Sequence, residues 1–154
     1  MISYRTATVD DINDLVSLRI IFLQEVEKNC NPKYDNKVRN SIYAYFMDNL
    51  PKKTYIPWLA LDDDKIVGTS GLSFNVVQPS YGNPSGKEAY IMNMYTIPEY
   101  RKKGIAKNLL DKTMEEAKKR EVGKIRLHAT SMGRPIYLKK GFEERNDEMV
   151  LFLS

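Results

Sequence analysis

Apolar positions recur along this chain with two different periods. A period of about 3.6 residues indicates an amphipathic helix, and strict alternation indicates a strand with one buried face. The first pattern predicts helices over 9–27, 36–49 and 104–120, and a short helix between Ser131, its expected cap, and Gly141. Alternation, or a short apolar run, predicts strands over 2–6, 55–61, 66–77, 89–97, 124–130, 142–145 and 148–153.

The predicted element order is therefore β-α-α-β-β-β-α-β-α-β-β. Three strands follow one another in the middle of the chain, and helices alternate with strands in the second half. This combination predicts an α/β architecture in which a mixed sheet carries helices on both faces. A length of 154 residues suits one domain over 1–154 with a substantial hydrophobic core.

Prolines and glycines indicate where the predicted helices end and where the predicted strands are irregular. We expect Pro51 to close the second helix. Pro57 favours an edge position or a bulge at the start of its strand, because proline cannot donate to a strand ladder. Gly68 and Gly71, inside the next strand, indicate a bulge or a close backbone approach.

The stretch 90–120 carries the clearest chemical signal in the chain. An apolar strand is stopped by Pro98, a basic loop with Gly104 follows, and an amphipathic helix begins. The first turn of a helix leaves N–H groups unpaired, and the helix dipole favours an anion there. Gly104 has no Cβ to keep a phosphate away from the main chain. The local pattern predicts an anion cradle without naming the anion.

The distribution of charge supports an anionic partner. The net charge is +4, but residues 101–145 hold 14 Lys and Arg against 6 Asp and Glu, and the remainder holds 10 against 14. Such an asymmetry indicates a phosphorylated small molecule or a nucleic acid. Lys112, Lys118 and Lys119 are more simply explained as a solvated helix face, because Glu115 and Glu116 lie at pairing distance.

Composition excludes several classes of site and location. The single cysteine, Cys30, and the single histidine, His128, rule out Cys/His zinc clusters, and the Asp62–Asp64 turn lacks the glycine and distant glutamate of a calcium loop. We therefore expect no metal site. No apolar run approaches the roughly 18–20 residues that span a bilayer, and the N-terminus lacks a secretory signal. A cytoplasmic protein without membrane contact is expected.

Two motifs together resemble a known family. Residues 101–106 read R-x-x-G-x-A directly after the apolar strand, and 137–142 read Y-x-K-x-G-F. Either motif alone is weak. In this order, with a helix and a strand between them, they resemble the GNAT N-acetyltransferases. The resemblance covers 89–142 closely, and the N-terminal third matches only in element order.

The resemblance implies acetyl-coenzyme A as cosubstrate and assigns residues to it. The strand edge at Met94, Tyr95 and Thr96 would bind the pantetheine arm where this strand and the one at 124–130 separate. The pyrophosphate would lie on the loop, and Thr130 stands where the family often has an asparagine that contacts the cofactor. The cofactor-binding residues expected from the resemblance are Met94, Tyr95, Thr96, Arg101, Lys102, Lys103, Gly104, Ile105, Ala106, Lys107, Thr130 and Tyr137.

The resemblance also implies direct acetyl transfer to an amine in a ternary complex. Tyr137, matching the family's tyrosine, would protonate the leaving thiolate. Some members use a strand glutamate as base at the position of Tyr90, so Glu88, two residues away on the same face, would act through water, unless ordered water suffices. Asn93 either orients substrate or bonds within the sheet, and His128 faces the cleft or a helix layer.

The acceptor is expected to be a primary amine of a small molecule, a peptide or a protein. Its contacts would come from 9–50 and the loop 78–87, with Tyr34, Tyr43, Trp58 and Phe74 as candidates to line the pocket. A homodimer is expected by family analogy only. Two alternatives stay open: an acyl-coenzyme A-binding or sensing module of the same fold, and a nucleic-acid-binding protein, which the pI of about 9.0 suggests but the lack of interleaved aromatic and basic residues opposes.

Overall fold

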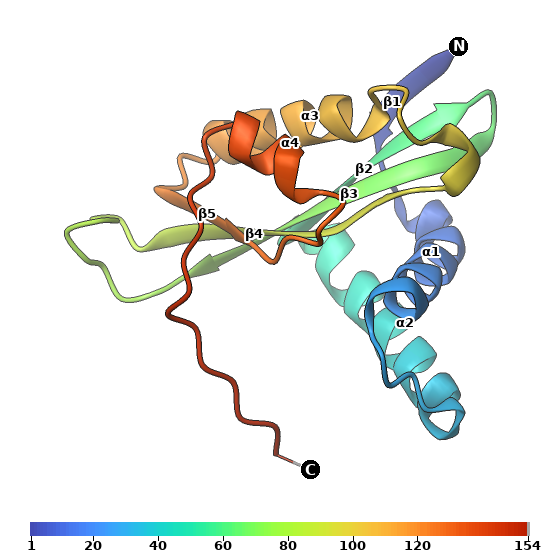
Figure 1. Cartoon of the computed structure of the whole chain (residues 1–154), viewed down its shortest axis with the longest axis horizontal. Helices are drawn as coiled ribbons and strands as arrows, with labels where there is room; N and C mark the ends of the chain where they lie inside the picture. The colour runs from blue at the N-terminus through green and yellow to red at the C-terminus, as the bar shows by residue number, and fades with distance from the viewer. Residues whose placement is uncertain (154) are drawn as a thin grey trace.

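The computed structural model describes residues 1–153 (Figure 1). Every helix and strand predicted up to Gly141 is present. The elements are β1 (Ile2–Thr6), a 3-10 turn (Val9–Asp11), α1 (Ile12–Val26), a 3-10 turn (Pro32–Tyr34), α2 (Asp35–Lys52), β2 (Tyr55–Asp62), β3 (Lys65–Val76), β4 (Lys87–Thr96), a 3-10 turn (Pro98–Tyr100), α3 (Ile105–Lys119), β5 (Lys124–Leu127) and α4 (Arg134–Lys139).

The five strands form one sheet in the order β1-β2-β3-β4-β5. Neighbours from β1 to β4 are antiparallel, and β4 and β5 are parallel because α3 carries the chain back over the sheet between them. α1 and α2 cover one face, and α3 and α4 cover the other (Figure 1). The predicted mixed sheet with helices on both faces is confirmed.

The hydrophobic core follows the two faces of the sheet. Apolar side chains under α1 and α2 form one cluster, centred on Phe46 and Tyr55, which stack with ring centroids 5.5 Å apart. The α3 side holds two further clusters, one around Ala60, Val67 and Leu109 and one that contains Tyr137. The inward residues of α3 recur at helical spacing along one face, and they belong to both clusters on this side of the sheet.

The predictions made from Pro51 and Pro57 were both wrong. α2 runs through Pro51 to Lys52, and Lys53 ends it in a left-handed conformation at φ 55°. A proline in the last turn removes only one helical hydrogen bond, so the helix tolerates it there. Pro57 does not lie at an edge, since β2 runs between β1 and β3. β1 stops opposite Trp58, and only the carbonyl of Pro57 is used beyond it, accepting from the N–H of Ala7 at 2.9 Å.

The two features predicted from the glycines of β3, a bulge and a close approach to the backbone, are both present. The pairing of β2 with β3 shifts next to Gly68, so that Val67 is an extra residue in the ladder. At Gly71, an added Cβ would stand 1.8 Å from the hydroxyl oxygen of Tyr55. Glycine at 71 therefore makes room for a buried tyrosine that belongs to the site described below.

The C-terminal predictions were wrong. Residues 142–153 form no strand, β5 ends at Leu127 rather than near Thr130, and Gly133 rather than Ser131 precedes α4. Alternation marks a segment able to pair, but a strand also needs a neighbour that accepts its hydrogen bonds. Here the segment passes β5 and extends away from the sheet (Figure 1). No helix among the described residues is long and apolar enough to cross a membrane.

Candidate active site

A bulge in the middle of β4 shapes the centre of the molecule. Gly71 lies opposite Met92 and Thr69 opposite Tyr95, so Asn93 and Met94 together face Ser70 across the ladder. Asn93 takes the left-handed conformation, with φ 59°. An extra residue of this kind bends its strand and ends regular pairing nearby.

β4 and β5 separate at this bulge. Their parallel pairing runs from Glu88 and Lys124 to Ile91 and Leu127 and then stops. The edge of β4 from Met92 to Thr96 is consequently open on the β5 side, and the predicted separation of the two strands is confirmed. The hydroxyl of Thr96 is buried there without a hydrogen-bond partner among the described residues. A buried unpaired hydroxyl beside a free strand edge fits a ligand that bonds along this edge.

The loop after β4 ends in a row of unused main-chain donors. Lys102 and Gly104 are both left-handed, with φ 61° and 80°. Among residues 1–153, nothing accepts a hydrogen bond from the N–H groups of residues 102–107, and the first α3 donor in use is Asn108, bonded to Gly104. A Cβ built on Gly104 meets no atom within 4 Å, so the space above the loop is open. This arrangement is an anion cradle at a helix N-terminus.

The basic side chains around the cradle have different roles. Lys102, Lys103 and Lys107 are exposed beside it. Arg101 instead turns back: its Nε donates to the carbonyl of Thr96 at 2.8 Å, and its terminal nitrogen pairs with Glu25 of α1 at 3.0 Å. The guanidinium therefore ties the loop to β4 and α1. Ile105 is buried under α3 and Ala106 is half-buried, so the two contribute main chain rather than side chain.

Tyr137 lies in α4, on the same face of the sheet as α3. It is 7% exposed, packs in one cluster with Ile91 and Leu110, and meets Phe142 edge-on at a centroid distance of 5.8 Å. Burial raises the pKa of Tyr137 to about 12, so the phenol stays protonated at neutral pH. No described residue hydrogen-bonds its hydroxyl. Thr130 is engaged nearby, where its Oγ1 accepts from the N–H of Gly133 at 3.2 Å and caps the turn before α4.

Glu88 and Tyr137 lie on opposite faces of the sheet. Ala89, the next residue, packs in the cluster of Tyr137, so alternation along β4 turns Glu88 to the α1/α2 face. Its carboxylate is buried and stands 3.8 Å from Lys124 and 3.7 Å from Arg126. It also lies at the start of β4, whereas the cradle follows the end of that strand, roughly 25 Å away along an extended chain.

A hydrogen-bonded chain on that same face was not foreseen from the sequence. The hydroxyl of Tyr90 bonds to Nδ1 of His128, and Nε2 of His128 lies 2.6 Å from a carboxylate oxygen of Glu148. Burial, and next the charge of Glu148, raises the pKa of Tyr90. His128 lies just beyond the point where β5 leaves β4, and its side chain is 63% exposed, so it is not covered by a helix layer. Nothing local in the sequence indicates a contact between residues 38 positions apart.

Asn93 is held from two sides. Its Oδ1 accepts from Arg19 of α1 at 2.8 Å, and its Nδ2 donates to the hydroxyl of Tyr55 at 2.8 Å. Tyr55 is only 1% exposed, and burial raises its pKa. Arg19 was missed, although an arginine inside the apolar run of α1 was a usable signal. These contacts fix the bulge against the helix layer on the α1/α2 face.

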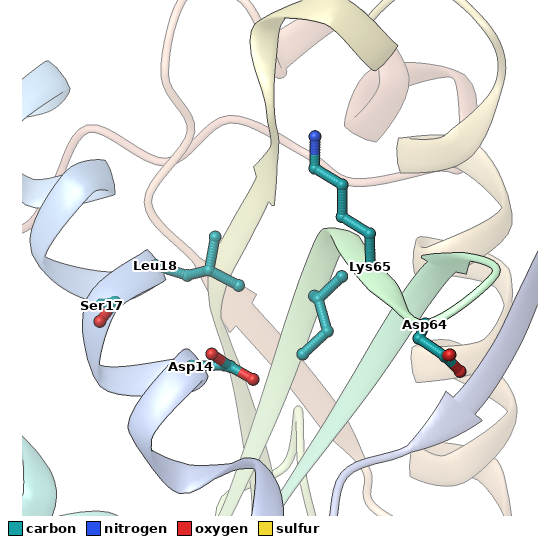
Figure 2. A pocket seen from close by; sticks show the side chains of 6 residues that line it. Asp14, Ser17, Leu18, Asp64 and Lys65 are labelled. Carbon is teal, nitrogen blue, oxygen red and sulfur yellow. The ribbon is translucent and has the colours of Figure 1, made fainter.

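The acceptor pocket predicted from aromatic residues does not assemble as expected. Trp58 and Phe74 pack on the α3 side of the sheet, and Tyr43 is exposed. Tyr34 lines a cavity of about 270 Å³ between α1 and α2. A second depression of about 290 Å³ lies between α1 and the β2–β3 turn, lined by Asp14, Ser17, Leu18, Asp64, Lys65 and Ile66 (Figure 2). Within residues 1–153, no group of three or more metal-binding side chains gathers.

The comparisons with known proteins agree with this geometry. The family model of the acetyltransferase (GNAT) family matches residues 20–142. A predicted acetyltransferase from Clostridium acetobutylicum, whose crystal structure contains acetyl-CoA, is 35% identical with a TM-score of 0.91, over 99% of this chain and 96% of that one. No curated protein matches the chain.

More distant structures share the fold. A GCN5-related N-acetyltransferase from Ralstonia eutropha JMP134 is 22% identical with a TM-score of 0.90, over 99% of both chains. An aminoglycoside acetyltransferase from an uncultured soil metagenomic sample is 18% identical with a TM-score of 0.73, over 100% of this chain and 99% of that one. With the family model and the Clostridium structure, the bulged open strand and the loop that follows it establish that the chain belongs to the GNAT family of acetyl-CoA-dependent acetyltransferases.

Proposed function

We propose that this enzyme transfers the acetyl group of acetyl-CoA directly to a primary amine in a ternary complex, with residues 1–154 acting as one catalytic domain. The observation that carries the proposal is the run of unpaired main-chain N–H groups of residues 102–107. These residues directly follow β4, whose edge beyond Ile91 is not paired with β5. Six adjacent main-chain donors with three exposed lysines suit a pyrophosphate. The presence of acetyl-CoA in the Clostridium structure supports the same ligand.

The open edge of β4 supports the position of the acyl group. Beyond Ile91 no residue of β5 pairs with β4, so main-chain groups of Met94 and Tyr95 and the N–H of Thr96 would bond the pantetheine arm along this edge, whereas the carbonyl of Thr96 is taken by Arg101. The edge begins at the bulge, where the amide groups around Asn93 leave the ladder. An amide N–H at such a position would polarise a thioester carbonyl and stabilise the oxyanion formed by amine attack.

The amine would enter from the α1/α2 face. On that face Arg19 bonds to Asn93 and Tyr90 bonds to His128, whereas Tyr137 packs on the α3 side of the sheet. We assign removal of the amine proton to water held by these side chains. Glu88 shares this face, but a chain of waters would have to connect its buried, ion-paired carboxylate to the amine.

Tyr137 would act on the leaving thiolate. Burial raises the pKa of Tyr137 to about 12, well above the range of an ordinary thiol, so full proton transfer from the phenol to the thiolate is uphill. Tyr137 therefore contributes chiefly as a hydrogen-bond donor to the developing thiolate, and the proton comes finally from solvent. Its unpartnered hydroxyl is available for this bond.

The proposal is tested by calorimetry with coenzyme A and by an acetylation assay over a panel of primary amines: amino sugars, polyamines and peptide N-termini. We expect micromolar or tighter binding of coenzyme A and turnover on at least one amine class. Binding without turnover on any amine would favour a sensing module of the same fold. Absence of coenzyme A binding would refute the proposal, and salt-sensitive binding of duplex DNA or RNA in its place would favour the nucleic-acid alternative.

A further inference from the structure

Three hydrogen-bonded side chains meet where β4 and β5 separate. The hydroxyl of Tyr90 bonds to Nδ1 of His128, and Nε2 of His128 lies 2.6 Å from a carboxylate oxygen of Glu148. Tyr90 belongs to β4, His128 follows the end of β5, and Glu148 belongs to the segment that passes β5 (Figure 1). The side chains of His128 and Glu148 are 63% and 46% exposed, so burial does not impose their contact.

The two ring nitrogens of His128 have different partners, and this sets the direction of the hydrogen bonds. A carboxylate only accepts hydrogen bonds, so Nε2 carries the ring proton and donates it to Glu148. In a neutral imidazole Nδ1 is then an acceptor, and the O–H of Tyr90 donates to it. The oxygen of Tyr90 keeps lone pairs for a further donor. A proton arriving at this oxygen can therefore be exchanged for the one that passes to His128.

Tyr90 lies on the same face of the sheet as the bulge. Alternation along β4 places it on the α1/α2 face, where Asn93 bonds to Arg19. Asn93 follows Tyr90 by three residues, or about 10 Å of extended strand. Burial, and next the charge of Glu148, raises the pKa of Tyr90, whereas Arg19 is near enough to lower it. A separation of this size suits an amine and one water molecule, because each hydrogen bond covers about 3 Å.

We propose that Tyr90, His128 and Glu148 form a proton relay that takes up the amine proton of the acceptor. The inference rests on the proposed function and names the side chain on which that proton arrives. Tyr90 is the catalytic residue, because it meets the amine directly or through one water. His128 receives the proton through Tyr90, and Glu148 is a positioning residue that holds the imidazole in the required tautomer.

The proton steps balance with acetyl transfer. The acceptor enters as an ammonium ion and gives one proton to the oxygen of Tyr90, whose own proton passes to Nδ1 of His128. The free amine attacks the thioester, so the C–N bond forms and the C–S bond breaks. Nitrogen loses its second proton to water, and the thiolate takes one from water. His128, an imidazolium beside Glu148, then returns the first proton to solvent, which reaches its exposed ring.

The remaining charges on this face lie around the relay. They belong to Arg19 of α1, Glu88 of β4, and Lys124 and Arg126 of β5. Glu88 stands 3.7 Å from Arg126 and 3.8 Å from Lys124, so its carboxylate is occupied by cations of β5. Of the side chains that the structure describes, only Tyr90 and Glu148 hydrogen-bond the imidazole. The pH dependence of proton removal is therefore assigned to the acceptor amine and His128.

Steady-state kinetics with an amine that is turned over provides the first test. Tyr90→Phe and His128→Gln should each lower kcat roughly 10²–10⁴-fold at neutral pH, with the affinity for coenzyme A unchanged. The double variant should lose no more than either single variant, because residues that act as a unit are not additive. Multiplied losses in the double variant, or an unchanged kcat in His128→Gln, would overturn the relay.

The carboxylate is tested with a matched control in the same segment. Glu148→Gln should lower kcat roughly 10-fold, because the imidazole loses its charged partner. Glu143→Gln should leave kcat unchanged, because Glu143 is exposed and pairs with Arg145 instead. Equal rates in these two variants would refute the role of Glu148.

The basicity of the acceptor separates proton removal from a structural effect. An amine that is largely unprotonated at the assay pH has already lost its first proton. The deficit of His128→Gln should therefore shrink along a series of amines of falling pKa, and added imidazole should restore part of the activity of His128→Ala. A deficit that stays constant along the series would contradict proton transfer.

NMR tests the relay without any substrate, because His128 is the single histidine of the chain. Nitrogen spectra of the isotope-labelled free enzyme should show the Nε2–H tautomer. Tyr90→Phe should shift the Nδ1 resonance, and Glu148→Gln the Nε2 resonance. The Nδ1–H tautomer, or ring resonances that respond to neither change, would overturn the relay. Absence of turnover on every amine would instead refute the proposed function, and the catalytic step with it.

Discussion

Replacement of Gly104 by alanine tests the cradle most directly. Gly104 has φ 80°, and a left-handed conformation costs an L-residue roughly 1–2 kcal/mol, part of which is offset by the lower entropy of the unfolded alanine chain. We expect a loss of about 1 kcal/mol in the free energy of unfolding. No protein atom lies within 4 Å of the added methyl group, so the folded structure without ligand needs no further adjustment.

The same methyl group projects into the space where an anion would approach residues 102–107. Loss of one charge-assisted hydrogen bond costs about 1.5–3 kcal/mol, so the dissociation constant of coenzyme A should rise roughly 10- to 150-fold. Isothermal titration calorimetry measures this change, and urea denaturation measures the stability.

Gly141→Ala is the matched control. Gly141 has φ 98°, and an added Cβ there also meets nothing within 4 Å, but it follows α4 and lies outside the cradle. Both variants should lose similar stability, and only Gly104→Ala should lose affinity. Equal affinities of wild type and Gly104→Ala would refute the assignment of the cradle to the phosphates.

Three further changes test the site and its support. Tyr137→Phe should lower kcat roughly 10- to 150-fold while the KM for acetyl-CoA changes little, because it removes one hydrogen bond to a developing thiolate. Tyr55→Phe leaves the buried Nδ2 of Asn93 without an acceptor, so urea denaturation should show a loss of about 1–3 kcal/mol. Asp11→Asn should cost about 1–2 kcal/mol at pH 7, since Arg5 and the N–H of Thr8 bond its carboxylate.

The Asp11 effect should depend on pH in one direction. The hydrogen bond from Arg5 lowers the pKa of Asp11 below its unfolded value, so the stabilisation is complete above about pH 4 and is lost as the pH falls through the folded pKa. The wild type and Asp11→Asn should therefore converge in acid. Asp48→Asn, on an exposed helix pair with Lys52, is the control and should change stability little at any pH. Unchanged kcat in Tyr137→Phe, or unchanged stability in Tyr55→Phe, would contradict the corresponding role.

The sequence by itself determined the local features of this protein. The order of helices and strands up to Gly141 follows from hydrophobic period, and the cradle follows from a contiguous strand, glycine loop and helix start. These features depend on residues a few positions apart, whose backbone geometry is set largely by their own chemistry. Gly104 in particular takes a conformation that few other residues accept.

Only the tertiary structure decided which distant residues meet. The bulge at Asn93 exists because β4 carries one residue more than β3 between two paired positions, which no local pattern encodes. Arg101 bonds Glu25 across 76 positions, and Tyr90 bonds His128 across 38. Such contacts depend on strand register and on which helix covers which face, and both are selected by packing of the whole core.

Residues 142–153 show the same limit from the other side. Alternation at 148–153 predicted a strand, and the structure has none there, because a strand also needs a neighbouring edge that accepts its hydrogen bonds. The hydrophobic period of a segment is encoded locally, whereas the presence of a neighbouring edge depends on how the whole chain packs. The sequence therefore determined which segments are able to pair, and the tertiary structure decided which of them do.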